Sequence, residues 1–278
     1  MIGYVGIDVG SVSTNLVFID DGGIIREAIY LRTQGKPIET VQRGLKELDG
    51  KLPSGTKVQG VGTTGSGRHL TGVIIGADAV KNEITAHAVA SSLLVPGLHS
   101  ILEIGGQDSK IIILRNGVVS DFAMNTVCAA GTGSFLDQQA GRLGIPIEKF
   151  GEIALQSKSS VRIAGRCAVF AESDMIHKQQ MGCGLPDILA GLCDALVRNY
   201  LNNVGKGKEI LAPVVFQGGV AANAGMVKAF EKALKLPVQV PPYYDVMGAV
   251  GAALLSREAV ARKGTSRFKY RPHDVVIR

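Results

Sequence analysis

Residues 7–24 read IDVGSVSTNLVFIDDGGI, and residues 102–119 read LEIGGQDSKIIILRNGVV. The two stretches align without a gap, so that each step of the first has its counterpart in the second. Each starts with an apolar strand and an acidic residue, turns through a Gly-rich polar segment, and continues as an apolar strand to an Asp-Gly or Asn-Gly pair. Such pairs next to apolar runs are strong signals of a β-hairpin. The chain therefore carries one hairpin motif twice.

The Gly-rich turns of the two hairpins have the composition of phosphate-binding loops. Glycines and hydroxyl residues in a tight turn expose backbone N–H groups in a concavity that suits a phosphate. The nucleotide-binding residues predicted in the turns are Gly10, Ser11, Val12, Ser13, Thr14, Gly105, Gly106 and Gln107. Asp8 and Asp108 would hold a hydrated Mg²⁺, which Asp8 would bind through water. Two ordinary hairpins without a ligand are the alternative, which the repetition in register disfavours.

A third Gly-rich segment, VVFQGGVAANAGMVKAFEKAL (214–234), predicts a strand, a turn and an amphipathic helix. The absence of side chains at Gly218 and Gly219 would let an adenosine lie against the start of this helix, beside Val220 and Asn223. The chain contains no G-x-x-x-x-G-K-[ST] sequence, which excludes a P-loop as the nucleotide site.

Composition restricts the class of protein and its partners. The chain of 278 residues is 46% hydrophobic and 19% charged, which is typical of a packed globular protein. No signal-peptide pattern and no apolar run of about 18 residues is visible, so we expect a cytoplasmic protein without a membrane partner. The net charge of +6 is concentrated in a basic tail, residues 257–278. This distribution is not typical of a nucleic-acid-binding face, and no nucleic-acid partner is expected.

Two of the four cysteines occur in matching contexts. Cys128 lies in NTVCAAGTGSFLDQQAGRLG before a predicted helix, and Cys167 lies in AGRCAVFAESDMIHKQQ at the start of another. A helix N-terminus favours a thiolate and a negatively charged cluster. Two cysteines cannot complete a four-thiolate iron–sulfur cluster, but two chains related by a twofold axis could. We expect Cys193 to be buried in a helix and Cys183 to be structural. The nucleotide-binding prediction also includes the helix start after Cys128, which consists of Gly131, Thr132 and Gly133.

The two hairpins and the Gly-Gly segment, in this order, resemble the superfamily of acetate kinases, sugar kinases, heat-shock proteins and actin. The resemblance implies an α/β, actin-like ATPase fold of two ribonuclease-H-like domains, with mixed sheets and flanking helices, that closes on ATP. The expected domains are residues 1–95 and residues 96–256, the second of which carries the two cysteines. The helix expected over 244–262 can instead complete the first domain, and residues 257–278 form the basic tail.

The stretches NTVCAAGTGSF, GRCAVFAESD, GIDVGSVSTN and EIGGQDSK resemble the activator ATPases (archerases) of 2-hydroxyacyl-CoA dehydratases and the ATPase subunits of benzoyl-CoA reductase. The resemblance implies a homodimer that holds one [4Fe-4S] cluster between its subunits, ligated by Cys128 and Cys167. It also implies that ATP, bound with Mg²⁺ and hydrolysed to ADP, drives a low-potential electron to an iron–sulfur dehydratase or reductase. Ferredoxin or flavodoxin would be the electron donor.

In this interpretation the catalytic residues are Asp8, Gln107 and Asp108. Asp8 would hold the Mg²⁺ shell, and Gln107 or Asp108 would orient the attacking water. Closure on ATP would tilt the helices that follow Cys128 and Cys167, and so change the surroundings of the cluster.

Two alternatives remain open from the sequence. A small-metabolite kinase of the same fold, such as a sugar kinase, would need a carboxylate base, for which Glu172, Asp174 and Asp121 are candidates. A non-catalytic, nucleotide-dependent assembly protein would keep the fold and lack hydrolysis.

Overall fold

The computed structural model describes residues 1–125, 127–266 and 268, and the chain divides into two compact units. Unit 1 consists of residues 1–96 together with the chain from Asp245 onward, and unit 2 spans Gly97–Tyr244. Among the described residues, no helix combines the length and the apolar character needed to cross a bilayer.

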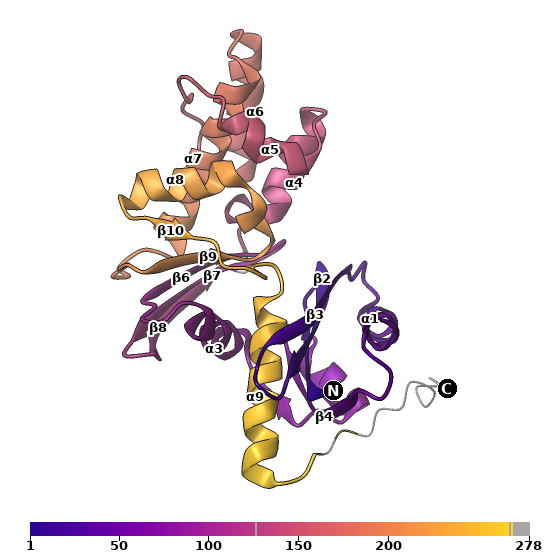
Figure 1. The fold of residues 1–278 in the computed structure, drawn as a ribbon. Helices are drawn as coiled ribbons and strands as arrows, with labels where there is room; N and C mark the ends of the chain where they lie inside the picture. Colours follow the sequence, from indigo (N-terminus) through magenta and orange to yellow (C-terminus); the bar gives the residue numbers. More distant parts are fainter. Residues whose placement is uncertain (126, 267, 269–278) are drawn as a thin grey trace. The chain divides into compact units, whose positions relative to one another are not determined.

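Unit 1 is built on a five-stranded mixed sheet in the order β3-β2-β1-β4-β5 (Figure 1). The strands are β1 (Ile2–Val9), β2 (Ser13–Asp20), β3 (Ile25–Arg32), β4 (Lys57–Thr64) and β5 (Ala79–Val80). The first three strands pair antiparallel, whereas β4 and β5 run parallel to β1. The N–H of Gly10 donates to the Ser13 carbonyl at 2.9 Å and closes the turn between β1 and β2, which confirms the first predicted hairpin.

Both faces of this sheet are buried, because successive side chains of a strand point to opposite sides. Ile7, Leu16 and Phe18 face α1 (Pro37–Lys51) and α2 (Arg68–Ile75). Tyr4, Val17 and Ile19 face the opposite side, where α9 (Met247–Lys263) covers the sheet and α3 (Glu83–Leu94) packs against α9. Figure 1 shows α1 and α9 on opposite sides of the sheet.

Helix α9 approaches the sheet closely because two strand positions lack side chains. A Cβ on Gly6 would overlap the Ala249 carbonyl, and a Cβ on Gly62 would overlap the Ala252 carbonyl. The helix expected over 244–262 is therefore α9, and it belongs to unit 1. Residues 257–263 of the expected basic tail are helical, because they form the last turns of α9. Residues 267 and 269–278 of that tail lie outside the described part of the chain.

Unit 2 repeats the sheet of unit 1. Its order is β10-β9-β6-β7-β8, with β6, β7 and β8 antiparallel and with β9 and β10 parallel to β6. The strands are β6 (Ser100–Ile104), β7 (Ser109–Arg115), β8 (Val118–Asn125), β9 (Val214–Gln217) and β10 (Val238–Gln239). The N–H of Gly105 donates to the Asp108 carbonyl at 3.0 Å, in the place of the Gly10–Ser13 bond of unit 1. Both predicted hairpins and the predicted mixed α/β architecture are confirmed.

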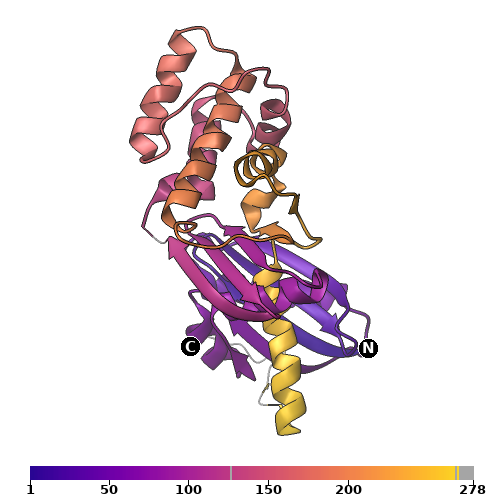
Figure 2. The same cartoon turned by 90° about the vertical axis from the view of Figure 1, so that its left-hand side faces the viewer.

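The helices of unit 2 include a group without a counterpart in unit 1. Between β8 and β9 the chain forms η1 (Ala129–Gly131), α4 (Gly133–Arg142), α5 (Ile147–Ala154), α6 (Ala168–Gln180) and α7 (Leu185–Asn203). After β9 follow η2 (Gly219–Ala222) and α8 (Ala224–Leu234). The α-helices among them bury apolar side chains in one core, to which α6 contributes only Ala171 and Met175 as buried residues. Figure 2 shows the helices of this group gathered together on one side of the strands of unit 2. In unit 1 the corresponding strands β3 and β4 are connected by α1 alone, so Cys128 and Cys167 lie in an insertion.

Candidate nucleotide and cluster sites

The first phosphate turn, between β1 and β2, is supported by Thr33. The Gly10 carbonyl accepts a hydrogen bond from Thr33 Oγ1 at 3.0 Å, and the Thr33 N–H donates to the Val12 carbonyl at 2.9 Å. Thr14 is fully buried, and its hydroxyl lies 2.9 Å from Thr33 Oγ1. Thr14 therefore supports the turn from inside the protein. The exposed or half-buried residues of the turn are Gly10, Ser11, Val12 and Ser13.

Asp8, near the end of β1, lies between the loop after β4 and the first turn of α9. A Cβ on Gly65 would lie 2.5 Å from Asp8 Oδ1, and a Cβ on Gly248 would overlap the Asp8 carboxylate. Both glycines therefore make room for the carboxylate. The positive end of the α9 dipole favours a negative charge at this place. Asp8 remains half-buried, so that it is accessible to a hydrated cation.

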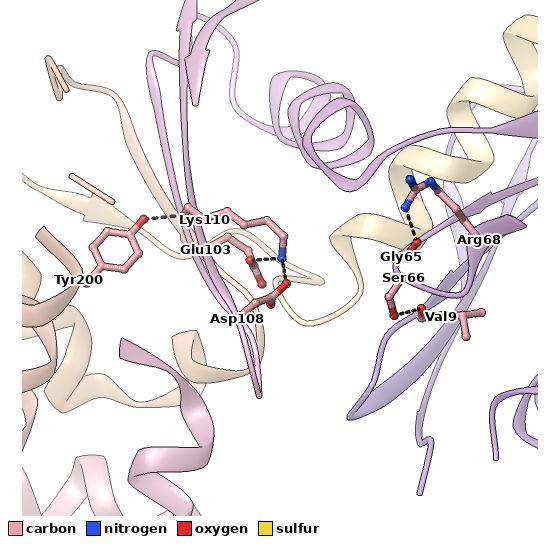
Figure 3. A network of polar contacts seen from close by, with 8 residues as sticks. All are labelled: Val9, Gly65, Ser66, Arg68, Glu103, Asp108, Lys110 and Tyr200. Atoms are coloured by element: carbon pink, nitrogen blue, oxygen red, sulfur yellow. Dashed lines mark hydrogen bonds and ion pairs between the residues drawn. The ribbon is translucent and has the colours of Figure 1, made fainter. Parts of the chain in front are cut away.

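The loop after β4 adds polar groups beside the first turn, as Figure 3 shows. The Val9 carbonyl accepts hydrogen bonds from Ser66 Oγ at 3.3 Å and from the Gly67 N–H at 2.9 Å. Arg68 Nη1 donates to the Gly65 carbonyl at 3.0 Å. This loop is absent from the residues predicted above. The signal that could have revealed it is the Thr-Thr-Gly-Ser-Gly run (63–67) that ends an apolar strand.

The second turn, between β6 and β7, is supported by a buried lysine. Lys110 Nζ donates to Glu103 Oε2 and to Asp108 Oδ2, both at 2.9 Å (Figure 3). The side chains of Lys110 and Glu103 are 3% and 6% exposed, whereas that of Asp108 is 32% exposed. Both carboxylates bind the same ammonium, and Asp108 is the one that is more exposed to solvent. Gln107 is exposed beside it.

Glu103 and Asp8 occupy equivalent positions of the repeat but have different surroundings. Glu103 is buried against Lys110, so we assign it to the support of the hairpin and not to cation binding. Tyr200 of α7 donates its hydroxyl to the Lys110 carbonyl at 2.6 Å, as Figure 3 also shows. Burial raises the pKa of Tyr200 well above its usual value, which keeps the hydroxyl protonated as a donor.

The three residues predicted at the start of α4 lie behind the second turn. The Gly133 N–H donates to the Gly105 carbonyl at 2.8 Å, and the Ser134 N–H donates to the Gly106 carbonyl at 2.8 Å. Gly131, Thr132 and Gly133 are buried. The first N–H groups of α4 are therefore used inside the protein, where they fix the turn. Direct contact between these three residues and a nucleotide stays a prediction.

The Gly-Gly segment has one 3₁₀ turn more than predicted. Gly218 has a φ of 85°, which favours glycine, and its N–H donates to the Tyr244 carbonyl at 2.8 Å. The chain then forms η2, and α8 begins only at Ala224, where Asn223 Oδ1 caps the helix by accepting the Met226 N–H at 3.1 Å. Gly219 is exposed, and a Cβ added to it would meet no atom within 4 Å. Val220 is buried and Asn223 is half-buried.

The two cysteine segments differ in their helices. Cys167 is the N-cap of α6, as predicted from the sequence. The helix predicted to start at Gly131–Gly133 is confirmed, because α4 begins at Gly133, although η1 stands between Cys128 and this helix. The first N–H groups of α4 also donate to the second turn and not toward Cys128. Asn125 instead fixes the Cys128 backbone, because its Oδ1 accepts the Cys128 N–H and its Nδ2 donates to the Cys128 carbonyl, both at 2.9 Å.

The segments of Cys128 and Cys167 meet at Asn199 of α7. Asn199 is 3% exposed, and its Nδ2 donates to the Gly165 carbonyl at 2.6 Å. The same nitrogen lies 4.0 Å from Cys128 Sγ. Both cysteines are half-buried, and the apolar neighbours Val127, Val169 and Phe170 are exposed. Asn199 was not predicted, although it is the polar member of an otherwise apolar buried face of α7.

Residues 5–256 match the model of the BadF/BadG/BcrA/BcrD ATPase family. The chain belongs to this family. It is 35% identical over 265 residues to the (R)-2-hydroxyglutaryl-CoA dehydratase activating ATPase of Acidaminococcus fermentans, which covers 92% of this chain and 98% of the relative. It is 36% identical over 262 residues to the activator of lactoyl-CoA dehydratase of Anaerotignum propionicum, with 93% and 98% covered.

A solved structure agrees with this assignment. The activator of the 2-hydroxyisocaproyl-CoA dehydratase from Clostridium difficile, with bound ADPNP, has a TM-score of 0.85 and 32% identity to this chain, with 96% of this chain and 100% of that chain covered. The family resemblance is therefore confirmed, and the protein is an ATPase of the BadF/BadG/BcrA/BcrD family.

In this ATPase, the three carboxylates considered for a kinase base have structural partners. Glu172 pairs with Arg142 at 2.7 Å, and Asp174 Oδ2 accepts the Ala164 N–H at 2.9 Å. Asp121 pairs with Lys208 at 2.6 Å, and the hydrogen bond from Lys208 lowers the pKa of that carboxyl. A general base must instead accept a proton from the substrate, so these contacts give no support to the kinase alternative.

Proposed function

We propose that this ATPase is an ATP-dependent activator that delivers low-potential electrons to an iron–sulfur dehydratase of the 2-hydroxyacyl-CoA type or to a related reductase. It would act as a homodimer with one [4Fe-4S] cluster between the subunits, and ferredoxin or flavodoxin would be its donor. The observation that carries the proposal is the placement of Cys128 and Cys167 in two segments that meet at Asn199, beside exposed apolar side chains.

The cysteines fit half of a cluster site. A [4Fe-4S] cluster takes four cysteine thiolates, and this chain brings Cys128 and Cys167 into one neighbourhood. A twofold copy would supply the other two thiolates. A cluster bound there would supply a one-electron carrier.

Exposed apolar residues support the homodimer. Val127 precedes Cys128, whereas Val169 and Phe170 follow Cys167, and all three side chains are exposed. Apolar side chains that gather on a surface usually mark an interaction site. A second copy placed over the cysteines would remove these side chains from water while completing the ligand set.

The nucleotide chemistry is assigned to the two turns. The N–H groups of residues 10–13 and 105–107 would bind the phosphates, and the Gly218–Asn223 segment would hold the adenosine. Asp8, whose carboxylate lies beside Gly248 in the first turn of α9, would hold Mg²⁺ through the water shell of the ion. Gln107 or Asp108 would orient the water that attacks the γ-phosphorus, whereupon ADP leaves.

A short path of backbone hydrogen bonds and intervening chain supports coupling between hydrolysis and the cysteines. The second turn is bonded to Gly133 and Ser134 at the start of α4, and η1 alone separates this start from Cys128. A change in the turn when the γ-phosphate leaves would therefore be transmitted to the Cys128 segment. This path replaces a helix dipole aimed from α4 at the cysteine, which the structure does not have.

The test is purification without oxygen of the wild type, Cys128→Ser, Cys167→Ser and the control Cys183→Ser. We expect the wild type and the control to be brown dimers that reduce a dehydratase when ATP is added. Each serine variant at the two ligand positions should lose iron and electron transfer while still binding ATP. A Cys128→Ser protein with full iron and full ATP-driven reduction would refute the proposal. A colourless wild type that phosphorylates a sugar would favour the kinase, and one with neither activity would favour the assembly protein.

A further inference from the structure

We infer that Asn199 is a positioning residue for the two thiolates, because it ties the Cys128 and Cys167 segments together and donates a hydrogen bond to Cys128 Sγ. The inference rests on the proposed function for its meaning, although the tie itself consists of contacts within one chain. Asn199 lies near the C-terminal end of α7, well separated in sequence from both segments.

The orientation of the Asn199 amide follows from its partners. A backbone carbonyl only accepts hydrogen bonds, so the atom 2.6 Å from the Gly165 oxygen must be the NH₂ group. This group has two hydrogens. One is used by the Gly165 carbonyl, while Cys128 Sγ lies 4.0 Å from the same nitrogen and can accept the other. The Arg166 carbonyl lies 3.5 Å away, so the contact extends to the residue that precedes Cys167.

The opposite end of the amide is also bound. Asn203, one turn later in α7, donates its Nδ2 to Asn199 Oδ1 at 2.9 Å. A buried amide is costly in an apolar environment unless its polar atoms have partners. Asn199 is nearly inaccessible to solvent and has partners on both its oxygen and its nitrogen. It therefore forms a fixed bridge between α7 and both cysteine segments.

Gly131 leaves room for this bridge. A Cβ at position 131 would lie 2.7 Å from Asn199 Oδ1 and 3.1 Å from Asn125 Nδ2. Asn125 is the residue that fixes the Cys128 backbone. The side-chain amides of Asn199 and Asn125 thus explain why position 131 is a glycine, without any contact to a phosphate.

Two consequences follow for a bound cluster. A hydrogen bond to a ligand sulfur stabilises the more negative, reduced form and so raises the reduction potential. A bridge between the two segments also limits their movement relative to each other, which keeps two ligands in place for assembly. Loss of the Asn199 amide should therefore lower the reduction potential and reduce the iron retained per dimer.

The experiment compares Asn199→Leu, which keeps the approximate volume, and Asn199→Ser, which is smaller, with the control Asn203→Ala. The control removes a partner of Asn199 Oδ1 but leaves both cysteine segments in contact with Nδ2. In metal-free protein, hydrogen exchange measured by mass spectrometry should become faster in residues 127–131 and 163–168 in the Asn199 variants and stay unchanged in the control. In cluster-loaded protein, redox titration should show a lower midpoint potential for the Asn199 variants alone.

The two readouts separate this inference from the proposed function. If the wild type binds no iron, the proposed function fails, while the exchange rates of metal-free protein still test the bridge. Exchange rates like those of the wild type in either segment would overturn the inference. An unchanged midpoint potential in a variant that retains its cluster would overturn it as well. Circular dichroism of each variant shows whether the fold is kept, and Asn199→Ser provides the test if Asn199→Leu does not fold.

Discussion

At the scale of single residues, Lys110 determines the charge balance of the second turn. Its ammonium is buried between Glu103 and Asp108, and Asp108 alone of the two carboxylates reaches solvent appreciably. Removal of one partner of a buried ion pair leaves the other charge desolvated.

Replacing Lys110 by methionine should therefore lower the free energy of unfolding by about 3–5 kcal/mol, because Glu103 keeps its burial and loses its ammonium partner. Urea denaturation at pH 7 measures the loss. Lys149→Met is the control, since it breaks an exposed pair with Glu152 and should leave the midpoint nearly unchanged. Similar midpoints for the two variants would contradict the assignment of Lys110 to a buried pair.

Cys193 should differ in reactivity from the proposed ligands Cys128 and Cys167. Burial, followed by the nearby charge of Asp194, raises the pKa of the Cys193 thiol, so the reactive thiolate is scarce at neutral pH. Iodoacetamide should modify Cys128 and Cys167 of the native, metal-free protein and leave Cys193 unmodified until urea is added. Peptide mass spectrometry resolves the three sites, and rapid native labelling of Cys193 would be inconsistent with its burial.

Local patterns and tertiary contacts account for what the sequence could and could not predict at this scale. The turn residues and Cys128 and Cys167 stand in short motifs, so they could be proposed as site residues without a structure. Lys110 and Asn199 act through partners brought close only by folding, and an alternating strand or an apolar helix face contains no sign of those partners. Asn199 did leave one trace, because it is an amide on the buried face of α7.

At the scale of elements, the strands were easier to predict than the helix starts. Each hairpin is specified by local turn chemistry, and the two copies, which align without a gap in the sequence, pair equivalent residues. The helix after Gly219 begins later than predicted, because the 3₁₀ turn η2 comes first, whereas α4 begins at the predicted Gly133 after η1. The positive φ of Gly218 and the contacts of the α4 start with the second turn determine those boundaries, and apolar periodicity does not report on either.

Two glycine substitutions in unit 1 should change its stability in opposite directions, because only Gly6 lies at the contact of α9 with the sheet. Gly6→Ala should destabilise unit 1 by about 1–3 kcal/mol, because the new methyl group would overlap the backbone of α9. Gly50 is an exposed position of α1, and a Cβ added there would meet no atom within 4 Å. Gly50→Ala should therefore raise the free energy of unfolding by about 0.5–1 kcal/mol. Thermal unfolding of both variants tests the contrast, and an equal shift in the same direction would contradict it.

The start of α7 should make stability depend on pH. Asp187 accepts hydrogen bonds from Ser157 Oγ at 2.6 Å and from the N–H groups of Lys158 and Ser159 at 3.0 Å, which lower the pKa of its carboxyl. A folded-state pKa below the unfolded value means that the stabilisation is present above the unfolded pKa and is lost as pH falls through the folded pKa.

Asp187→Asn should therefore be less stable than the wild type at pH 7, and the difference should shrink as pH falls below about 3.9, where the carboxyl is protonated in the unfolded chain before it is protonated in the folded protein. Urea denaturation at a series of pH values measures the difference. A gap that is the same at pH 7 and pH 3 would show that the charge of Asp187 does not contribute.

At the scale of the whole molecule, the chain contains one sheet topology twice and one large insertion. The duplicated order was visible in the sequence because both copies keep the same turn spacing. The course of the insertion was not visible, because α4, α5, α6 and α7 are placed by one shared core rather than by local signals.

A bound nucleotide should raise the unfolding temperature of the protein more when the nucleotide carries more phosphates. Binding only to the folded state adds about 2.7 kcal/mol to the free energy of unfolding at a ligand concentration 100 times Kd. With Mg²⁺ present, ADP should raise the unfolding temperature more than AMP at equal concentration, because AMP lacks the β-phosphate that the turns are proposed to bind. Equal shifts for ADP and AMP would argue that the turns do not bind phosphate.

The hydrogen bonds between the start of α4 and the second turn should make mutations in this stretch affect two traits at once. The few residues from Cys128 to Ser134 include a proposed ligand of the cluster. They also include Gly133 and Ser134, whose N–H groups fix the second turn, a proposed phosphate-binding loop. A single lesion in this stretch should therefore be pleiotropic, with defects in both hydrolysis and electron delivery in a genetic screen. Selection on one trait would then constrain the other, and compensating changes would have to arise on both sides of the bond.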